Sequence, residues 1–362
     1  MARKLKVVFC WEEVNGYMAA CWRALQARGR FDVSIIGGRP GTIVADNKYS
    51  EDLTQGLDAH LFGAKDLHNV VRMQALFSEL NPDIIFIPGW SLKGLTALTR
   101  HPDYKHCKFI MGFDTPRLDT WRQKLAWVKI GRLVSRMAAV AVPGERGFQF
   151  ASQLLRVPEH KIWKGLYGFD YQSFSKAMIL RKTNDNHWPK RFLYLGRFVK
   201  VKGVDILLEA YAKYRKTVSQ PWGLWCYGSG RISEDFKGRD GVDSPGFAQP
   251  SELCDIFSRF GAFILPSRIE PWGVVIGEAA SSGLPIICTH ACGASVELVR
   301  PFYNGLLVET ENVDDLTRKM IWVHKNHREL PGMGARSQEL ARAFSADAWA
   351  ERWEHYLDSL GS

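Results

Sequence analysis

Two glutamates separated by seven residues, Glu270 and Glu278, are the residues of this chain best placed to do chemistry. A buried apolar run over 261–265 predicts a strand before them, and an apolar helical pattern follows. Pro271 restricts Glu270 to an extended or turn conformation, so we expect its carboxylate on the loop after the strand. Glu278 falls about one turn inside the helix. Gly273 lets a ligand approach the backbone, and the free N–H groups of the helix start suit an anion such as phosphate. Two carboxylates around an anion site are suited to a sugar nucleotide.

The residues 267–273 read Ser-Arg-Ile-Glu-Pro-Trp-Gly, and this frame carries a family resemblance. With the second glutamate at 278, it resembles the Glu-x7-Glu signature of retaining glycosyltransferases with the GT-B fold, especially family four (glycosyl transferases group 1). Two glutamates at this spacing are a weak signal alone, and a surface helix with two solvated glutamates is the plain alternative. The frame and its strand-turn-helix context favour the resemblance. It covers nearly the whole chain and is specific over 191–305.

The resemblance implies a role for each glutamate. Glu278 holds the ribose hydroxyls of the nucleotide, and Glu270 holds hydroxyls of the transferred sugar, since charged acceptors bind hydroxyls well. The backbone N–H groups of four residues contact sugar and phosphate: Trp272, Gly273, Val274 and Val275. A covalent nucleophile at Glu270, as in retaining glycosidases, is the alternative. The resemblance favours a mechanism in which the donor phosphate and the acceptor lie on the same face of the sugar. The donor phosphate then takes the acceptor proton.

Two basic residues follow the strand expected over 191–195. Arg197 and Lys202 lie between Gly196 and Gly203, which resembles the family's Gly-Arg…Lys-Gly motif. By that resemblance both cations offset the charge that a diphosphate gains as it leaves the sugar, so that no metal is needed. A pair of solvated basic residues is the alternative.

Two further segments resemble nucleotide-binding loops of the family. Gly228 and Ser229, in Gly-Ser-Gly after a strand, match a turn that passes near the nucleotide. Phe247 and Ala248 lie in the segment that matches the base-binding loop. Each segment also has an ordinary reading, as a turn and as the start of a capped helix near Ser251.

The N-terminal half matches the family less well. Gly16 alone matches the glycine-bearing loop that the family places near donor phosphates and acceptor. Where the family often has a histidine after the strand at 108–112, this chain has Asp114. That carboxylate is suited to orienting a sugar hydroxyl, to accepting the acceptor proton, or to capping the turn before Pro116. Tyr167 likewise replaces an asparagine of the family's interdomain passage.

Strand and helix patterns alternate along the chain and restart after a polar stretch at 181–190, which predicts parallel sheets covered by helices on both faces. We therefore expect an α/β protein with two Rossmann-like domains facing each other across a cleft, the GT-B fold, and a C-terminal helix that crosses back to the first domain. The expected parts are an acceptor-binding domain over 1–172, a nucleotide-sugar donor domain over 173–340 and a terminal helix over 341–362. Thirteen expected elements define this pattern. They are strands at 5–10, 31–36, 83–88, 108–112, 140–143, 191–195, 222–227, 261–265 and 284–288, and helices at 15–28, 66–80, 131–139 and 144–155.

Composition limits the functional classes. No run of 18 apolar residues occurs, so we expect no membrane-spanning helix. The odd number of cysteines, 7, fits a reduced cytoplasm. Cys288 and Cys292 are expected to pack rather than to bind a metal.

The two halves of the chain differ in charge. Residues 1–172 carry 24 Lys and Arg against 16 Asp and Glu, whereas residues 173–362 carry 24 against 22. The basic half suits an acidic acceptor or anionic lipid better than nucleic acid, because no nucleic-acid module is recognised.

Residues 121–133 combine aromatic and basic side chains. A helix here places Trp121, Leu125 and Val128 on one side, with Arg122, Lys129 and Arg132 at its flank. This pattern suits an anionic membrane that carries a lipid-linked acceptor. A helix packed on the sheet with a basic outer face is the alternative, and is slightly favoured.

The sequence thus predicts a cytoplasmic, metal-independent, retaining glycosyltransferase of the hexosyltransferase type, acting in polysaccharide or glycan biosynthesis. Its partners are a nucleotide-diphosphate sugar and a saccharide, lipid-linked or glycoconjugate acceptor, with peripheral contact to the inner membrane face as a hypothesis. No cofactor is expected. The alternatives are a phosphorylase or a sucrose- or glycogen-type synthase on the same fold, and a catalytically idle relative that binds sugar nucleotides.

Overall fold

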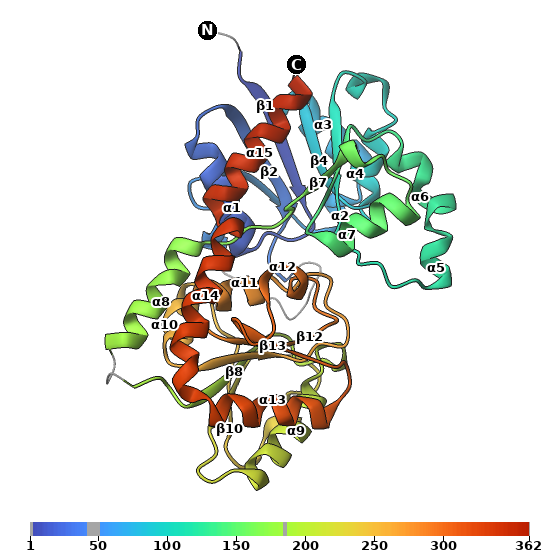
Figure 1. Ribbon diagram of the computed structural model, residues 1–362. Coiled ribbons are helices and arrows are strands. Elements are labelled where there is room, and N and C mark those ends of the chain that lie inside the picture. The colour runs from blue at the N-terminus through green and yellow to red at the C-terminus, as the bar shows by residue number, and fades with distance from the viewer. Residues whose placement is uncertain (1–2, 42–50, 184–186, 362) are drawn as a thin grey trace. The chain divides into compact units, whose positions relative to one another are not determined.

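The chain forms two compact units, each built around one parallel sheet (Figure 1). The computed structural model describes residues 3–41, 51–183 and 187–361; residues 184–186 of the polar stretch lie outside the described residues. The first unit comprises Met1–Phe169 with Ala346–Ser362, and the second comprises Asp170–Ser345. The α/β class expected from the alternating patterns is confirmed in both units.

The first unit contains a seven-stranded sheet in the order β3-β2-β1-β4-β5-β6-β7, and every pair is parallel. The strands are β1 Leu5–Trp11, β2 Phe31–Gly38, β3 Asp58–Phe62, β4 Ile84–Pro88, β5 Lys108–Gly112, β6 Ala139–Val142 and β7 Ile162–Lys164. The helices are α1 Gly16–Ala27, α2 Ala64–Leu67, α3 Val70–Leu80, α4 Lys93–Leu98, α5 Trp121–Lys124, α6 Ala126–Val134, α7 Glu145–Gln149 and α15 Ala346–Gly361.

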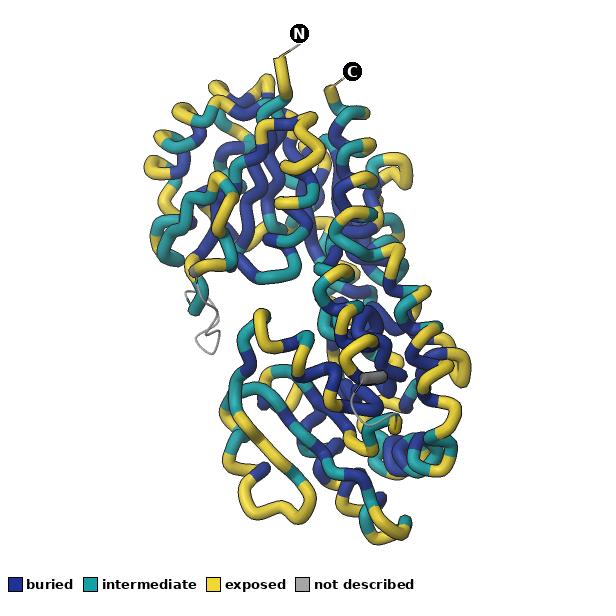
Figure 2. Tube along the Cα trace, turned by 90° about the vertical axis from the view of Figure 1, so that its left-hand side faces the viewer, coloured by how far each residue is buried: buried dark blue, intermediate teal, exposed yellow. Residues whose placement is uncertain are grey.

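Helices cover both faces of this sheet, as the alternation along β1 illustrates. Val7 and Phe9 face a core shared with α1 and α15, whereas Val8 and Cys10 face the core on the other side. Both sets are buried, because a parallel sheet with helices on both faces exposes neither of them. Figure 2 shows the buried residues gathered in the interior of the unit.

The C-terminal helix α15 belongs to the first unit, so the expectation that it crosses back is confirmed. Trp349 and Trp353 stack with ring centroids 5.0 Å apart and are buried against Phe9. Their indole N–H groups donate to the carbonyls of Leu166 and Gly165, at 3.0 and 3.1 Å. The helix therefore supplies core residues and also fixes the chain that follows β7.

The second unit contains a six-stranded parallel sheet in the order β10-β9-β8-β11-β12-β13. The strands are β8 Arg191–Leu195, β9 Gly223–Tyr227, β10 Val242–Gly246, β11 Ala262–Leu265, β12 Ile286–Thr289 and β13 Gly305–Val308. The helices are α8 Tyr171–Thr183, α9 Val204–Thr217, α10 Leu253–Ser258, α11 Val274–Ser281, α12 Ser295–Leu298, α13 Val313–Lys325 and α14 Leu330–Ala341.

In each sheet the strand order reverses once, between β1 and β4 in the first unit and between β8 and β11 in the second. Loops leaving two such neighbouring strands diverge to opposite sides and leave a crevice at the carboxyl edge, where ligands of open α/β sheets bind. Among the described residues, no helix is long and apolar enough to cross a membrane.

Some expected elements differ from the observed ones. The single helix expected over 66–80 is two helices, α2 and α3, because Asn69 leaves the helical conformation and its side chain accepts from Arg72 N at 3.1 Å. The strands β3, β7, β10 and β13 are not among the expected ones. The helix expected over 131–139 ends earlier, because α6 ends at Val134 and β6 begins at Ala139. The helix considered from residue 121 is likewise two short helices, α5 and α6.

Candidate active site

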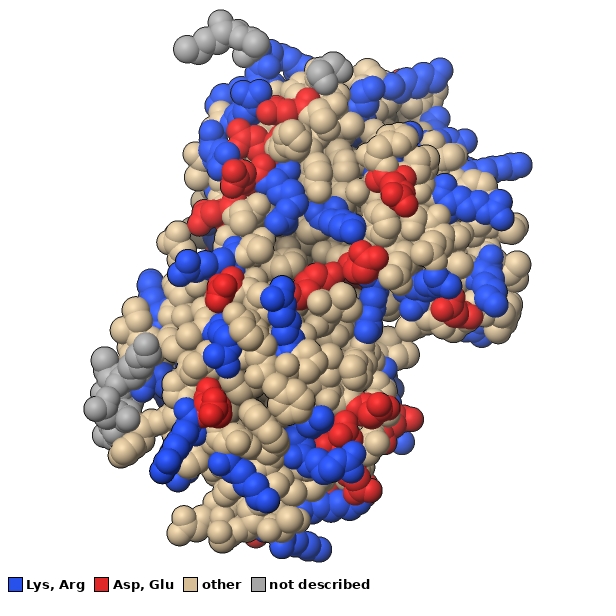
Figure 3. Space-filling view, in the orientation of Figure 1, with Lys and Arg blue, Asp and Glu red and all other residues tan. Residues whose placement is uncertain are grey.

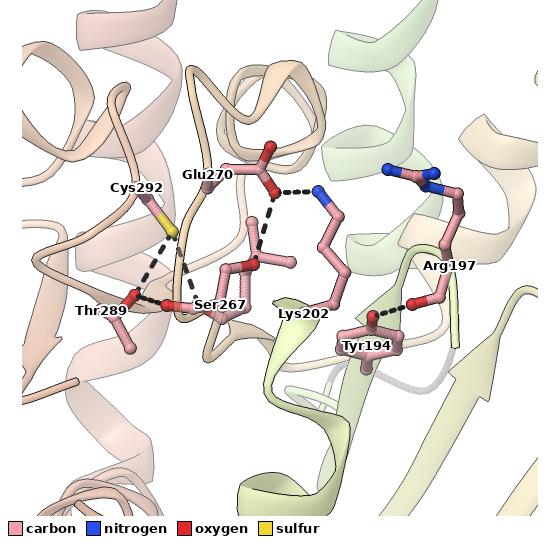
Figure 4. Close-up of polar contacts among 8 residues, drawn as sticks. Tyr194, Arg197, Lys202, Ser267, Glu270, Thr289 and Cys292 are labelled. Atoms are coloured by element: carbon pink, nitrogen blue, oxygen red, sulfur yellow. Dashed lines mark hydrogen bonds and ion pairs between the residues drawn. The ribbon is translucent and has the colours of Figure 1, made fainter. Parts of the chain in front are cut away.

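Lys202 and Glu270 meet at the point where the strand order of the second sheet reverses. Lys202 lies on a short 3-10 turn, Lys200–Lys202, after β8, and Glu270 lies on the loop after β11. Their side chains form an ion pair between Nζ and Oε2 and are only 15% and 9% exposed. Figure 4 shows the pair at the centre of a polar network. The structure thus brings together two of the residues selected from the sequence, although they lie 68 positions apart.

Two glycines allow this approach. Gly203 has φ +67°, and a Cβ atom there would lie 1.9 Å from the carbonyl oxygen of Pro266. Gly273 has φ +89°, and a Cβ atom there would lie 3.0 Å from Cγ of Glu270. Both backbone conformations disfavour other residues. Gly203 therefore lets its turn lie against Pro266, and Gly273 lets the start of α11 lie against Glu270.

Arg268 fixes the position of the Lys202 turn. Its guanidinium binds both carboxylate oxygens of Asp205 in α9, at 2.7 and 2.9 Å. Its backbone N–H donates to the carbonyl of Val201 at 2.8 Å. The Arg268 guanidinium in turn lowers the pKa of Asp205. The bidentate pair holds the loop of Glu270 and the turn of Lys202 as one body, because its planar geometry allows little rotation.

The loop after β12 supports Glu270 from the other side. Thr289 Oγ1 donates to the carbonyl of Ser267 at 2.6 Å, and Ser267 Oγ donates to Glu270 Oε2 at 3.3 Å. The N–H of Gly293 donates to the carbonyl of Glu270 at 3.0 Å. The thiol of Cys292 packs beside Thr289, at 3.6 Å from Oγ1, and is buried. The segment with two cysteines thus supports the Glu270 loop.

Arg197 is the second cation of this site. Its side chain is exposed and extends to the same side as Lys202 (Figure 4). The buried hydroxyl of Tyr194 donates to the carbonyl of Arg197 at 2.9 Å and fixes the turn that carries it. Within the part of the chain that the structure describes, no carboxylate pairs with the Arg197 guanidinium, so its charge is available to an anion.

Glu278 lies on α11, one turn after Gly273. Burial raises the pKa of its carboxyl group to about 7, although part of the residue remains accessible. Across residues 3–41, 51–183 and 187–361, no hydrogen bond or ion pair is made by this carboxylate. A ligand with hydroxyl groups can therefore supply the donors that Glu278 lacks.

Apart from Gly16, which begins α1 in the first unit, the remaining residues predicted to bind the donor follow the carboxyl ends of strands in the second sheet. Ser229 accepts at its carbonyl from Phe198 N at 2.8 Å, and Gly228 N donates to the carbonyl of Gly246 at 2.8 Å. Phe247 and Ala248 directly follow β10. Trp272, Gly273, Val274 and Val275 form the entry to α11, and the indole of Trp272 is buried against Phe344.

The first unit has a pocket of about 470 Å³ of its own, at the reversal point between β1 and β4. Carboxylates of Glu12, Glu13 and Asp114 line it together with aromatic rings, among them Trp90 and Tyr167. Acidic and aromatic groups together suit a ligand with hydroxyl groups and apolar ring faces. They disfavour a ligand that carries negative charge.

The two positions at which this chain departs from the family pattern contact each other in that pocket. The hydroxyl of Tyr167 donates to Asp114 Oδ2 at 3.0 Å. Burial, followed by the charge of Asp114, raises the pKa of Tyr167 well above its ordinary value, so this phenol stays a donor. Gly16 begins α1 but is not among the lining residues, and Arg117 pairs with Asp119 at 2.7 Å.

Sequence reasoning missed the residues that support the site. Arg268 carries no signal beyond its place in the frame at 267–273, and no sequence pattern points to its partner Asp205. Ser267 and Thr289 carry no signal of their own, since their roles depend on which strands are neighbours. The i+3 spacing of Ser267 and Glu270 is the one local cue.

The comparisons with known proteins concern the family and the fold. Residues 175–340 match the model of the family described as Glycosyl transferases group 1. An uncharacterized glycosyltransferase of Methanocaldococcus jannaschii is 30% identical over 181 residues, which are 48% of this chain and 48% of that protein. Sulfoquinovosyl transferase SQD2 of Arabidopsis thaliana is 27% identical over 314 residues, 80% of this chain and 59% of that protein. The matches to the first curated relatives thus span about half of their length.

A solved structure extends the likeness to both units. HepE of Anabaena, in complex with UDP, has a TM-score of 0.74 and 16% identity, covering 98% of this chain and 100% of that chain. At this identity the likeness concerns the fold. It confirms the two Rossmann-like domains of the GT-B class, and the family match over 175–340 confirms the resemblance drawn from the motifs.

Proposed function

We propose that this chain, a relative of the glycosyl transferases group 1 by its residues 175–340, is a retaining glycosyltransferase. It transfers a sugar from a nucleotide diphosphate to a hydroxyl of a saccharide or glycoconjugate. The single observation that carries the proposal is the buried Lys202–Glu270 pair at the reversal point of the second sheet. Burying an ion pair costs desolvation free energy, which only close geometry and further hydrogen bonds offset. Such a pair at the edge of the sheet where ligands bind therefore favours a functional role.

The donor nucleotide binds the second unit. Arg197 and Lys202 contact the diphosphate, together with the first N–H groups of α11, and offset the negative charge that develops as the glycosidic bond breaks. Two protein cations at the leaving group make a metal dispensable. Glu270 holds Lys202 in place and accepts hydrogen bonds from hydroxyls of the transferred sugar, while Glu278 accepts from the ribose.

The acceptor binds the pocket of the first unit. Its carboxylates suit an uncharged, hydroxyl-rich acceptor, and Trp90 offers a flat apolar surface to a sugar ring. Asp114, oriented by Tyr167, holds the reacting hydroxyl. The hydroxyl oxygen bonds to the anomeric carbon on the face from which the diphosphate leaves, and the leaving phosphate takes the hydroxyl proton. Because bond formation and bond breaking occur on the same face, the configuration at the anomeric carbon is retained.

The experiment that tests this function is a thermal-shift screen with UDP, GDP, ADP, dTDP and CDP in EDTA. We expect one nucleotide to raise Tm clearly, because a ligand that binds only the folded state stabilises it by about 2.7 kcal/mol at 100 times its Kd. The matching donor sugars are then tried with neutral acceptors, and the anomeric configuration of the product is read by NMR. The absence of any shift at millimolar nucleotide would overturn the donor site; an inverted product would overturn the retaining mechanism.

The raised pKa of Glu278 predicts that nucleotide affinity depends on pH. Ribose hydroxyls bind the ionised carboxylate, whose fraction rises from about one tenth at pH 6 to about nine tenths at pH 8 for a pKa of about 7. Affinity should therefore rise up to about tenfold over this range, with proton release on binding. Calorimetry in buffers of different ionisation enthalpy measures both quantities.

Glu278→Gln serves as the control for this prediction, because the terminal phosphate of the nucleotide titrates in the same range. In this variant the pH dependence that comes from the phosphate remains, and the pH dependence that comes from the Glu278 carboxyl group is lost. Equal pH dependence in the wild type and in Glu278→Gln would show that Glu278 does not contact the ribose in its ionised form.

A further inference from the structure

The first unit exposes a group of large apolar side chains around α5 and α6. Trp121 is 68% exposed, Val128 76%, and Leu118 and Leu125 are 48% exposed each. These residues lie close together in sequence and are held in a defined geometry: Gln123 binds the carbonyl of Pro116 and the N–H of Leu118, both at 2.7 Å. We call Leu118, Trp121, Leu125 and Val128 the apolar edge.

The apolar edge is distinct from the face by which α6 packs on the sheet. Ala126, Ile130 and Leu133 pack against the core, and Val134 is buried within it. One apolar side of the helix thus packs on the core, whereas the apolar side chains on its outer side are exposed. The packing of α6 on the core agrees with the packed helix that the sequence slightly favoured, but the outer face carries exposed apolar side chains as well as basic ones.

Positive charge surrounds the apolar edge. Residues 120–144 contain no Asp or Glu. Their five cations are all exposed: Arg122, Lys124, Lys129, Arg132 and Arg136. Figure 3 shows Lys and Arg side chains gathered on the side of the first unit that α5 and α6 form.

We propose that the apolar edge and its cations form a docking surface for a bilayer that contains anionic lipid. Exposed Trp and aliphatic side chains enter the region between headgroups and acyl chains, while the cations bind phosphate groups. Charge complementarity favours anionic lipid, because five exposed cations over 120–144, with no carboxylate among them, match a surface of phosphate groups. The docking surface goes beyond the proposed transferase activity and does not rest on it.

Vesicle flotation of the full chain tests the docking surface without any turnover. Vesicles of phosphatidylcholine with about one third phosphatidylglycerol should carry the protein, and vesicles of phosphatidylcholine alone should not. Lys124→Glu combined with Lys129→Glu should lower the partition coefficient at least about 25-fold, since each cation near the surface contributes about fivefold. Trp121→Ser combined with Val128→Ser should also lower it, which an electrostatic contact alone would not cause.

Matched controls exclude an effect of net charge. Lys216→Glu combined with Lys325→Glu makes the same charge change at exposed positions of the second unit and should leave flotation unchanged. All variants should keep the Tm of the wild type and the nucleotide-induced shift, so a failure of docking is distinguishable from a failure of the donor site. Equal flotation of wild type and of both α5–α6 variants would overturn the proposal. The proposal would also be overturned if the wild type is a dimer and the Trp121→Ser and Val128→Ser changes convert it to a monomer.

Discussion

Replacing Lys202 by alanine should lower kcat by about two to three orders of magnitude, the effect typical of removing one group that stabilises developing charge. The contact to the leaving diphosphate is strongest in the transition state, so kcat should fall more than KM rises. Glu270→Gln should also lower turnover well over tenfold, because it removes the charge that orients Lys202. Initial rates with the nucleotide sugar identified by the thermal-shift screen measure both effects.

Two checks accompany this prediction. Lys200→Ala is the matched control: Lys200 lies on the same turn, is exposed, and should retain activity within about twofold. Since Lys202→Ala leaves Glu270 buried without its partner, Tm is measured for each variant, and Glu270→Gln preserves the shape of the site if the alanine variant does not fold. Folded variants of both residues with near-normal turnover would mean that the site is assigned wrongly.

The second large effect is expected in the first unit. Asp114→Asn should lower kcat/KM about 100-fold, because a neutral amide holds the reacting hydroxyl less strongly than a carboxylate. Tyr167→Phe removes the hydrogen bond to Asp114 and should lower it about tenfold, by about 1.4 kcal/mol. Steady-state kinetics at several acceptor concentrations separate the effect on acceptor KM from the effect on kcat.

A double-mutant cycle tests whether Tyr167 acts through Asp114. If it does, the combined variant should be little worse than Asp114→Asn alone, since residues that share one function are not additive. Tyr356→Phe is the control: its exposed hydroxyl donates to the carbonyl of Lys164, and its loss should leave kcat/KM unchanged. Fully additive losses would show that Tyr167 contributes to stability or binding independently of Asp114.

The central strands of both sheets were largely predictable from the sequence, because they are short apolar runs buried on both faces. β8 and β5 have the expected bounds, and β11 differs by one residue. The missed strand β10 lies at the edge of its sheet, is mostly exposed and contains Pro245, which edge strands tolerate. β3 is likewise an edge strand without a fully buried residue.

The candidate site was predictable in its residues but not in its contacts. Glu270, Lys202 and Arg197 follow from motifs, yet their arrangement depends on β8 and β11 being neighbours, which no local pattern encodes. The contact between Tyr167 and Asp114 spans 53 positions and joins two departures from the family pattern. Taken alone, each departure removes a residue that the family pattern has at that position. Only the strand order shows that Tyr167 and Asp114 are hydrogen-bond partners.

The position of α15 has a consequence for how the chain folds during synthesis. Trp349 and Trp353 complete a core that begins with β1, and Ala346 N donates to the carbonyl of Phe169 at 2.8 Å. The first unit therefore lacks part of its interior until α15 has been synthesised, which is after the whole of the second unit. The second unit, a continuous segment, has all of its strands earlier. The second unit can thus reach its native state before the first unit, whose core stays incomplete until α15 packs on it.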